Sequence, residues 1–268
     1  AVGHDHTCFM SMLGLVKCTG SNNYGQLGLG HSTNLYPATT RADWIQLGSN
    51  RTATMIDAGE LYTCALLDDG VVKCWGHNGY GQLGLGHYNN MGDHPNEMGD
   101  QLPAVSLGQP AIDLSAGRRH ACAVLQDGTL KCWGNNQYGT LGLGSTQNKV
   151  IPQTVDLGPG MKALDVEAGY LNTCVIMTTG QVKCWGYGQY GLFGPSYDSI
   201  GDNNGETGES LPFVDLGTSR HATSLFLAET NACASMSDLT TLCWGDDYYG
   251  YHGCLLYTSD AADDANCV

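Results

Sequence analysis

The stretch GELYTCALLDDGVVKCWGHNGYGQLGLG, residues 59–86, decides the fold of this 268-residue chain, because its outline recurs along the sequence. Two short, apolar, β-prone runs, residues 62–67 and 71–75, flank an Asp-Asp-Gly segment that ends at Gly70. Such runs around a three-residue loop predict a β-hairpin in which the glycine takes the left-handed backbone conformation. The unit of this chain is therefore expected to be a hairpin followed by a glycine-rich turn.

The two cysteines of this hairpin mark five repeats. If Leu67 faces Val71 across the loop, Cys64 lies opposite Cys74, so we predict a cross-strand disulfide in each hairpin. The same spacing of ten occurs in Cys8/Cys18, Cys64/Cys74, Cys122/Cys132, Cys174/Cys184 and Cys233/Cys243. Successive first cysteines are 56, 58, 52 and 59 residues apart, a period typical of a propeller or another repeat array. In the chain-entropy model, each bridge would add roughly 3 kcal/mol to the free energy of unfolding.

The loop glycine stands four residues before the second cysteine in the first four repeats, at Gly14, Gly70, Gly128 and Gly180. The fifth repeat has Leu239 at this position. Because a leucine is disfavoured in the left-handed conformation, we expect the fifth hairpin to turn differently.

A tryptophan follows the second cysteine in four repeats, at Trp75, Trp133, Trp185 and Trp244, while the first repeat has Thr19. An aromatic side chain that recurs once per repeat is typical of a core residue between units. A ligand platform is the alternative interpretation.

The glycine-rich segments after each tryptophan lack the Gly-Lys-Ser/Thr of a phosphate-binding loop, so we interpret them as tight turns. Their tyrosines are candidate contacts for a partner, and packing between units is the equal alternative. These residues are Tyr24, Tyr80, Tyr138, Tyr190, Tyr248 and Tyr249.

The complete pattern, from HTC or YTC through KCWG to GQLGLG, resembles the repeat of the regulator of chromosome condensation family, in a cysteine-paired variant seen in secreted and cell-surface proteins. The resemblance implies an all-β fold, a β-propeller of four-stranded antiparallel blades, seven-bladed in the best-known members. The five repeats are then expected to be part of a larger ring. The sequence also begins inside a repeat, so we expect it to be a piece of a longer protein.

Composition restricts the cellular compartments and the classes of partner that fit this chain. The chain has 26 acidic and 11 basic residues and a formal charge of −15, which disfavours nucleic-acid binding. Twelve cysteines, ten of them in regular pairs, indicate an oxidising compartment, and their spacing does not fit a zinc site. No apolar run is long enough for a membrane span. We therefore expect an extracellular or cell-surface protein without membrane insertion.

Two repeats carry an acidic insertion: MGDHPNEMGDQLPAVSLG at residues 91–108 and IGDNNGETGESLPFVDLG at residues 200–217. Clustered carboxylates are the ligands that calcium prefers, but neither insertion has the EF-hand order, and a solvated surface loop is the alternative. The candidate ligands are Asp93, Glu97, Asp100, Asp202, Glu206 and Glu209. No other cofactor is expected.

Residues 50–52 form the sequon Asn50-Arg51-Thr52, so Asn50 is a candidate glycosylation site, with a bare surface turn as the alternative. His6 and His120 share one repeat position with Tyr62, Asn172 and Asn231. A catalytic base would not be interchangeable with asparagine, so we expect a polar residue that bonds backbone where a strand begins.

We predict a single propeller domain over residues 1–253, with repeats at about 1–55, 56–110, 111–162, 163–220 and 221–253. The stretch CLLYTSDAADD from Cys254 resembles a translated sequencing adapter, so residues 254–268 are predicted to be an artefact tail outside the fold. A genuine tail with a sixth bridge between Cys254 and Cys267 is the alternative.

Three functions remain open at this point. No convergent set of acid, base and nucleophile is found, so we expect a non-enzymatic module with a structural or adhesive role, binding a protein partner or belonging to a larger extracellular assembly. A secreted protein inhibitor or ligand-binding propeller is the second possibility. The member that named the family is an exchange factor for a small GTPase, and this third role is disfavoured because it requires a reducing compartment.

Overall fold

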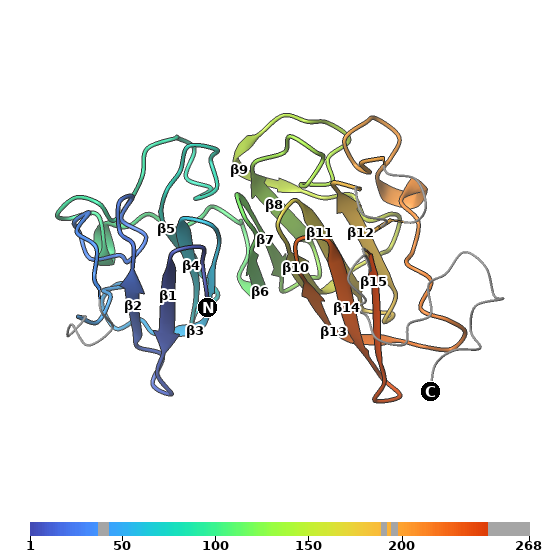
Figure 1. The fold of residues 1–268 in the computed structure, drawn as a ribbon, viewed down its shortest axis with the longest axis horizontal. Coiled ribbons are helices and arrows are strands. Elements are labelled where there is room, and N and C mark those ends of the chain that lie inside the picture. Colours follow the sequence, from blue (N-terminus) through green and yellow to red (C-terminus); the bar gives the residue numbers. More distant parts are fainter. Residues whose placement is uncertain (37–42, 189–191, 194–197, 246–268) are drawn as a thin grey trace.

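The computed structural model describes residues 1–36, 43–188, 192–193 and 198–245, and these form a β-structure (Figure 1). The strands are β1 (His6–Met10), β2 (Val16–Gly20), β3 (Ala53–Ala58), β4 (Tyr62–Leu67), β5 (Val72–Gly76), β6 (Ala111–Ala116), β7 (His120–Leu125), β8 (Leu130–Gly134), β9 (Lys149–Thr154), β10 (Ala163–Ala168), β11 (Asn172–Met177), β12 (Val182–Gly186), β13 (Ala222–Leu227), β14 (Asn231–Met236) and β15 (Thr241–Gly245). Two short 3-10 helices, η1 (Gly99–Gln101) and η3 (Gly208–Ser210), lie in the acidic insertions. Tyr190, Tyr248, Tyr249 and the tail 254–268 lie outside the described residues.

The strands form one antiparallel sheet per repeat. The sheets are β1-β2, β3-β4-β5, β6-β7-β8-β9, β10-β11-β12 and β13-β14-β15, each built from strands consecutive in sequence. Figure 1 shows the sheets following one another around a curve, and the first strands of neighbouring repeats contact each other. This is the blade arrangement of a β-propeller, the fold predicted from the repeats.

The prediction that each blade has four strands is met in only one of the described sheets. Among the described residues only the third repeat has the fourth strand, β9, which pairs with β8. In the second and fourth repeats, the segment after the glycine-rich turn pairs with the last strand only at isolated bridges, such as Gly76 with Met91 and Gly186 with Ile200. The chain then leaves the blade as the acidic insertion, whose Gly, Asp and Asn residues are poor strand formers.

The hairpins have the register that the loop predicts. Leu67 N donates to Val71 O at 2.8 Å, and Cys64 pairs with Cys74 across the ladder. All five cysteine pairs are disulfide-bonded: Cys8–Cys18, Cys64–Cys74, Cys122–Cys132, Cys174–Cys184 and Cys233–Cys243. Each sheet therefore carries one covalent link between the two strands of its hairpin.

The prediction for the fifth hairpin was wrong. Leu239 has a φ of 67°, in the same left-handed region as Gly70 at 79°. Its N–H donates to Met236 O at 3.0 Å, matching the Gly70 to Leu67 bond. The flanking register and the bond from Thr240 N to Asp238 Oδ1 at 3.0 Å fix the length of the loop, so residue 239 must take this conformation. Its side chain avoids a clash because it is 97% exposed.

The tryptophans connect consecutive repeats. Trp75, Trp133 and Trp185 are fully buried, and Trp244 is 4% exposed. Each of the first three donates from its indole Nε1 to a backbone carbonyl in the glycine-rich turn of the preceding repeat, at 2.9 to 3.1 Å: Trp75 to Gln26, Trp133 to Gln82 and Trp185 to Thr140. The indoles are thus core residues between blades and not a ligand platform.

Candidate interaction surface

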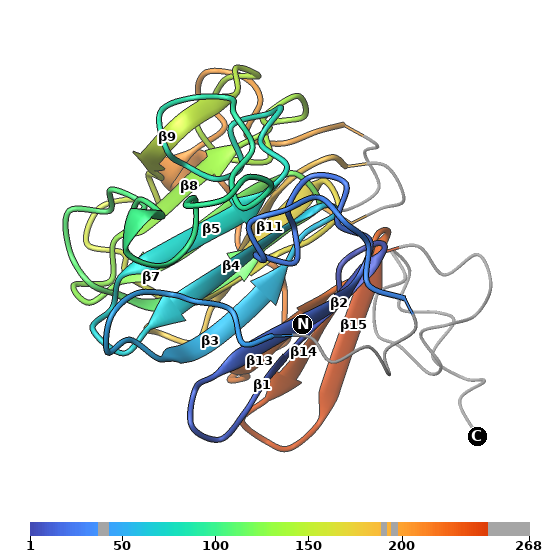
Figure 2. The same ribbon diagram turned by 90° about the vertical axis from the view of Figure 1, so that its left-hand side faces the viewer.

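One end of the blades gathers aromatic and cationic side chains, and we call it the entry rim. It is formed by the loops 59–61, 117–119 and 169–171 before β4, β7 and β11, together with the glycine-rich turns. Backbone bonds join the two parts, as in Asn135 N to Arg119 O at 2.9 Å. The hairpin loops lie at the opposite end, where Figure 2 shows those of β1-β2 and β14-β15.

The turn tyrosines of the entry rim contact the next repeat. The ring of Tyr24 lies 4.8 Å from that of His77, and the ring of Tyr138 lies 4.5 Å from that of Tyr187. Tyr80 receives a hydrogen bond from Arg119 Nη1 at 2.8 Å. The described tyrosines therefore pack between repeats and still keep an accessible face, with Tyr24 37% exposed.

A salt-bridge cluster fixes the middle of this rim. Glu60 accepts from Arg119 Nε at 2.6 Å and from Arg118 Nη2 at 3.1 Å. Burial raises the pKa of Glu60, but the hydrogen bonds from both arginines outweigh it and hold the pKa below its ordinary value. Arg118 lies over the ring of Tyr170 at 4.1 Å. The result is a preorganised surface in which two guanidinium groups share Glu60 and each packs on a phenol ring.

The two histidines at the start of a strand are structural. His120 Nε2 lies 2.9 Å from Thr173 Oγ1, and Thr173 donates to Thr140 O at 2.8 Å. His6 makes the same contact with Thr63 at 2.9 Å. Burial lowers the pKa of both imidazoles to about 4, so each is neutral and donates to its threonine.

These contacts partly correct the sequence interpretation. Each histidine bonds a threonine side chain of the next repeat, and His120 also bonds the backbone of Asn172 as predicted. Tyr62, at the same repeat position, does bond backbone, because its hydroxyl donates to Gly117 O at 3.0 Å. In the first three repeats this position therefore joins one repeat to the next.

The carboxylates of the acidic insertions organise the loops themselves. Glu97 Oε2 accepts from the backbone N–H of Gly92 and His94 at 2.9 and 3.0 Å, and Glu206 does the same for Gly201 and Asn203 at 3.0 Å. Asp100 accepts from Ser49 N at 2.7 Å. In the described ranges no three His, Cys, Asp or Glu side chains are placed to hold a metal ion together. The six candidate calcium ligands are thus not brought together as a site, and calcium binding stays a prediction.

Both insertions dock on the preceding repeat. Gly30 N donates to Gly92 O, and Gly144 N to Gly201 O, each at 3.0 Å. Lys183, which is 2% exposed, donates to Gly208 O at 2.7 Å and to Leu157 O at 3.0 Å. A lysine of the blade therefore ties down η3 of the fourth repeat.

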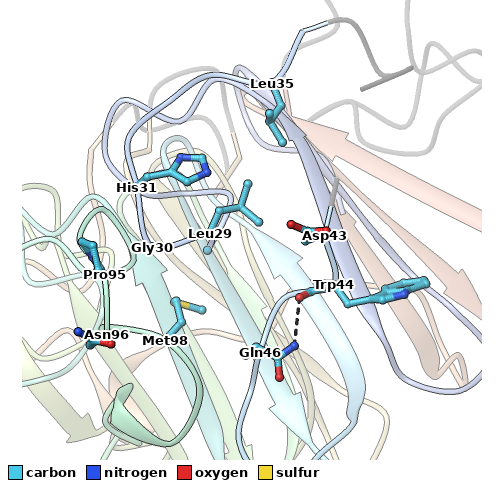
Figure 3. Close-up of a pocket in the computed structure, with 11 residues that line it drawn as sticks. Leu29, Gly30, His31, Leu35, Asp43, Trp44, Gln46, Pro95, Asn96 and Met98 are labelled. Carbon is cyan, nitrogen blue, oxygen red and sulfur yellow. Dashed lines mark hydrogen bonds between the residues drawn. The ribbon is translucent and has the colours of Figure 1, made fainter. Parts of the chain in front are cut away.

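A pocket of about 750 Å³ lies between the turn of the first repeat and the insertion of the second (Figure 3). Leu29 and Met98 give it an apolar part, while His31, Asp43, Gln46 and Asn96 give it polar groups. His31 Nδ1 accepts from Thr33 N at 3.1 Å, which commits that nitrogen to its own turn. Figure 3 shows the indole of Trp44 directed away from the other labelled side chains, and Lys17 lies over this ring at 4.2 Å.

A cluster on the first strands was missed in the sequence. Asp57 on β3 accepts from Ala116 N on β6 at 2.7 Å, and Asp113 on β6 accepts from Val166 N on β10 at 2.8 Å. Burial raises the pKa of Glu167 on β10 to about 8, and Asp57 adds to the rise. Burial and Asp113 raise the pKa of Asp165 to about 6. An alignment of the first strands would have shown acids recurring at two positions, but not that these strands are neighbours.

The family comparison agrees with this architecture. Models of the "Regulator of chromosome condensation (RCC1) repeat" match residues 56–82, 111–140 and 164–192, and a second model of that description matches 127–176. The chain contains RCC1 repeats. Over 194 residues it is 32% identical to the ultraviolet-B receptor UVR8 of Arabidopsis thaliana, a match that covers 72% of this chain and 42% of the receptor. The chain thus spans less than half of that relative.

Solved structures show the same fold. Human WBSCR16 superposes with a TM-score of 0.75 at 22% identity, over 94% of this chain and 62% of that one. Yeast RCC1 (Prp20), solved in complex with Kap60, gives a TM-score of 0.68 at 20% identity, over 91% of this chain and 55% of that one. The RCC1 repeats of this chain therefore build a propeller like those of known members.

Proposed function

We propose that this chain belongs to a non-enzymatic, extracellular propeller of RCC1 repeats that acts as a structural or adhesive module and binds a protein partner through its entry rim. The observation that carries the proposal is the disulfide in every hairpin, from Cys8–Cys18 to Cys233–Cys243. Regularly placed bridges persist in oxidising compartments and are rare in the cytosol. Within the described residues, no helix has the length and apolarity to cross a bilayer.

The entry rim supports the binding role. Arg118, Arg119 and the turn tyrosines are residue types enriched at protein interfaces, and the Glu60 salt bridges fix them before any partner arrives. Yeast Prp20, which shares the fold, was solved bound to the protein Kap60. In the described part of the chain, His6 and His120 are buried donors and the cysteines are bridged, which favours a module without catalysis.

Thiol counting on native protein tests the compartment. We expect the ten paired cysteines to stay unreactive in denaturant until a reductant is added. Close to ten free thiols in freshly isolated protein would remove the extracellular assignment and restore the exchange-factor role.

A charge reversal tests the entry rim. Arg118→Glu should weaken binding of the labelled protein to cell surfaces or matrix by about tenfold or more, because an interfacial cation becomes a repelled anion. Arg51→Glu is the matched control, because Arg51 pairs with Asp69 near the opposite end of the blade at 2.7 Å. Equal binding by both variants would show that the entry rim is not the contact.

A further inference from the structure

A second groove, separate from the pocket of Figure 3, lies where the second and third repeats meet on the entry rim. Its volume is about 490 Å³. The lining consists of phenol, amide and hydroxyl groups: Tyr80 and Tyr88 from the second repeat, and Asn135, Gln137, Thr146, Gln147 and Asn148 from the third. No charged side chain is among these lining residues.

Beside the groove, one repeat position changes from a ring to an amide. The residue after Trp-Gly is His77 in the second repeat and Tyr187 in the fourth, and each ring packs on the turn tyrosine of the preceding repeat. In the third repeat this residue is Asn135, which has no ring to place against Tyr80. The guanidinium of Arg119 covers the Tyr80 ring at 4.7 Å instead, and the groove lies beside this junction.

The polar groups of the groove are held in place. Asn148 Oδ1 accepts from Asn136 N at 2.9 Å, and Asn135 Oδ1 accepts from Gln137 N at 3.3 Å. These bonds use the amide oxygens, so the NH₂ of the exposed Asn148 is a donor available to a ligand, whereas Asn135 is only 6% exposed. Arg119 fixes Tyr80 in two ways. Its Nη1 donates to the Tyr80 hydroxyl at 2.8 Å, and its guanidinium carbon lies 4.7 Å from the centre of the Tyr80 ring. Little conformational entropy would be lost on binding.

We propose that this groove binds a neutral carbohydrate. Sugar hydroxyls both donate and accept, as do the amides and the Thr146 hydroxyl, and a sugar's C–H face packs by dispersion on an accessible phenol such as Tyr88, which is 57% exposed. An anionic glycan is disfavoured by the overall charge of −15 and by the absence of a lining cation. A peptide is less suited, because the groove has no charged group to anchor its side chains or termini.

The inference extends the proposed extracellular role by naming a ligand class for one junction, and it rests on that role only in needing access to surface glycans. The test uses the full chain on an array of neutral, sialylated and sulfated glycans, followed by titration of the best neutral oligosaccharide. Asn135→Tyr restores the ring that the flanking junctions carry, and Tyr88→Ala removes the exposed phenol. Tyr36→Ala, an exposed tyrosine of the first repeat at 61%, is the control.

We expect wild type and Tyr36→Ala to bind neutral glycans equally, and both groove variants to lose about tenfold or more in affinity with unchanged circular dichroism. If Asn135→Tyr fails to fold, Tyr88→Ala still decides the question. Binding confined to acidic glycans, binding unchanged in Tyr88→Ala, or no neutral ligand at millimolar concentration would each overturn the site. Cell-surface binding that persists without glycan binding would remove the groove ligand but leave the adhesive role intact.

Discussion

His120 Nε2 lies 2.9 Å from Thr173 Oγ1, and this contact joins the third repeat to the fourth. The Thr173 hydroxyl donates a hydrogen bond to Thr140 O at 2.8 Å, and the same carbonyl accepts from the Trp185 indole at 3.0 Å. The arrangement repeats between the first two blades, where His6, Thr63 and Gln26 take these places. At these two junctions the adjacent blades are therefore held together by a short buried hydrogen-bond chain that starts from a neutral imidazole.

This chain predicts a pH effect on stability. Because burial lowers the pKa of folded His120 to about 4, from an ordinary value near 6.5, the unfolded chain binds more protons between these values. The contribution of His120 to the free energy of unfolding is therefore full above pH 6.5 and falls as the pH drops toward 4, by on the order of 3 kcal/mol at most. His120→Asn, the residue of the fourth and fifth repeats, should reduce this loss. Urea unfolding at pH 7 and 4.5 measures it, and an unchanged pH dependence would refute the assignment.

The carboxylates of the first strands predict a pH dependence of the free energy of unfolding that is opposite in sign to that of His120. Burial first, and then Asp57, raises the pKa of Glu167 to about 8, so the folded chain holds a proton that the unfolded chain releases above its lower pKa. The free energy of unfolding should fall as pH rises from about 4.5 to 8. Glu167→Gln should thus gain at least about 1 kcal/mol over wild type at pH 9 and little at pH 4.5. Thermal unfolding at both pH values is the measurement, and the exposed Glu229→Gln is the control, expected to change neither.

Local rules predicted the hairpins because the loop alone fixes their register. Once Gly70 turns the chain, Cys64 must face Cys74, and the disulfide and the following Trp75 take their places without knowledge of distant residues. The recurrence of that hairpin also predicted the propeller.

Contacts between repeats were harder to predict. Asp57, Asp113 and Glu167 come together only because β3, β6 and β10 are neighbours in the fold, and no motif links them in the sequence. The groove beside Asn135 is likewise lined by residues of two repeats, and the sequence does not show that these residues are neighbours.

The fifth hairpin offers a stabilising substitution. Leu239 holds a φ of 67° with its side chain in solvent, and the left-handed conformation costs a non-glycine residue roughly 1–2 kcal/mol. Leu239→Gly should therefore raise the free energy of unfolding by about 1 kcal/mol, after the extra chain entropy of glycine is counted. Gly70→Leu should destabilise, because a Cβ at Gly70 would lie 2.5 Å from Pro110. Denaturant titration compares them, and a less stable Leu239→Gly protein would show that the loop is not strained.

Lys183 predicts how the acidic insertion is held. Its ammonium is buried between Gly208 O and Leu157 O and lies over the Phe213 ring at 4.7 Å, so the blade, the insertion and the preceding repeat meet at one cation. Lys183→Met keeps the apolar stem but removes the ammonium donor from both carbonyls, of which Gly208 O keeps only the bond from Leu211 N at 3.3 Å, and this should cost about 1–3 kcal/mol in local stability.

Hydrogen exchange shows which residues of Lys183→Met lose stability. Faster exchange is expected at residues 200–211, while β11 and β12 remain protected because their ladder and the Cys174–Cys184 bridge are unchanged. Lys131→Met is the matched control, since Lys131 holds the same repeat position in the third blade, which carries β9 in place of an insertion. Equal exchange at residues 200–211 in wild type and Lys183→Met would mean that the loop is held by Glu206 and the Gly201 contact alone.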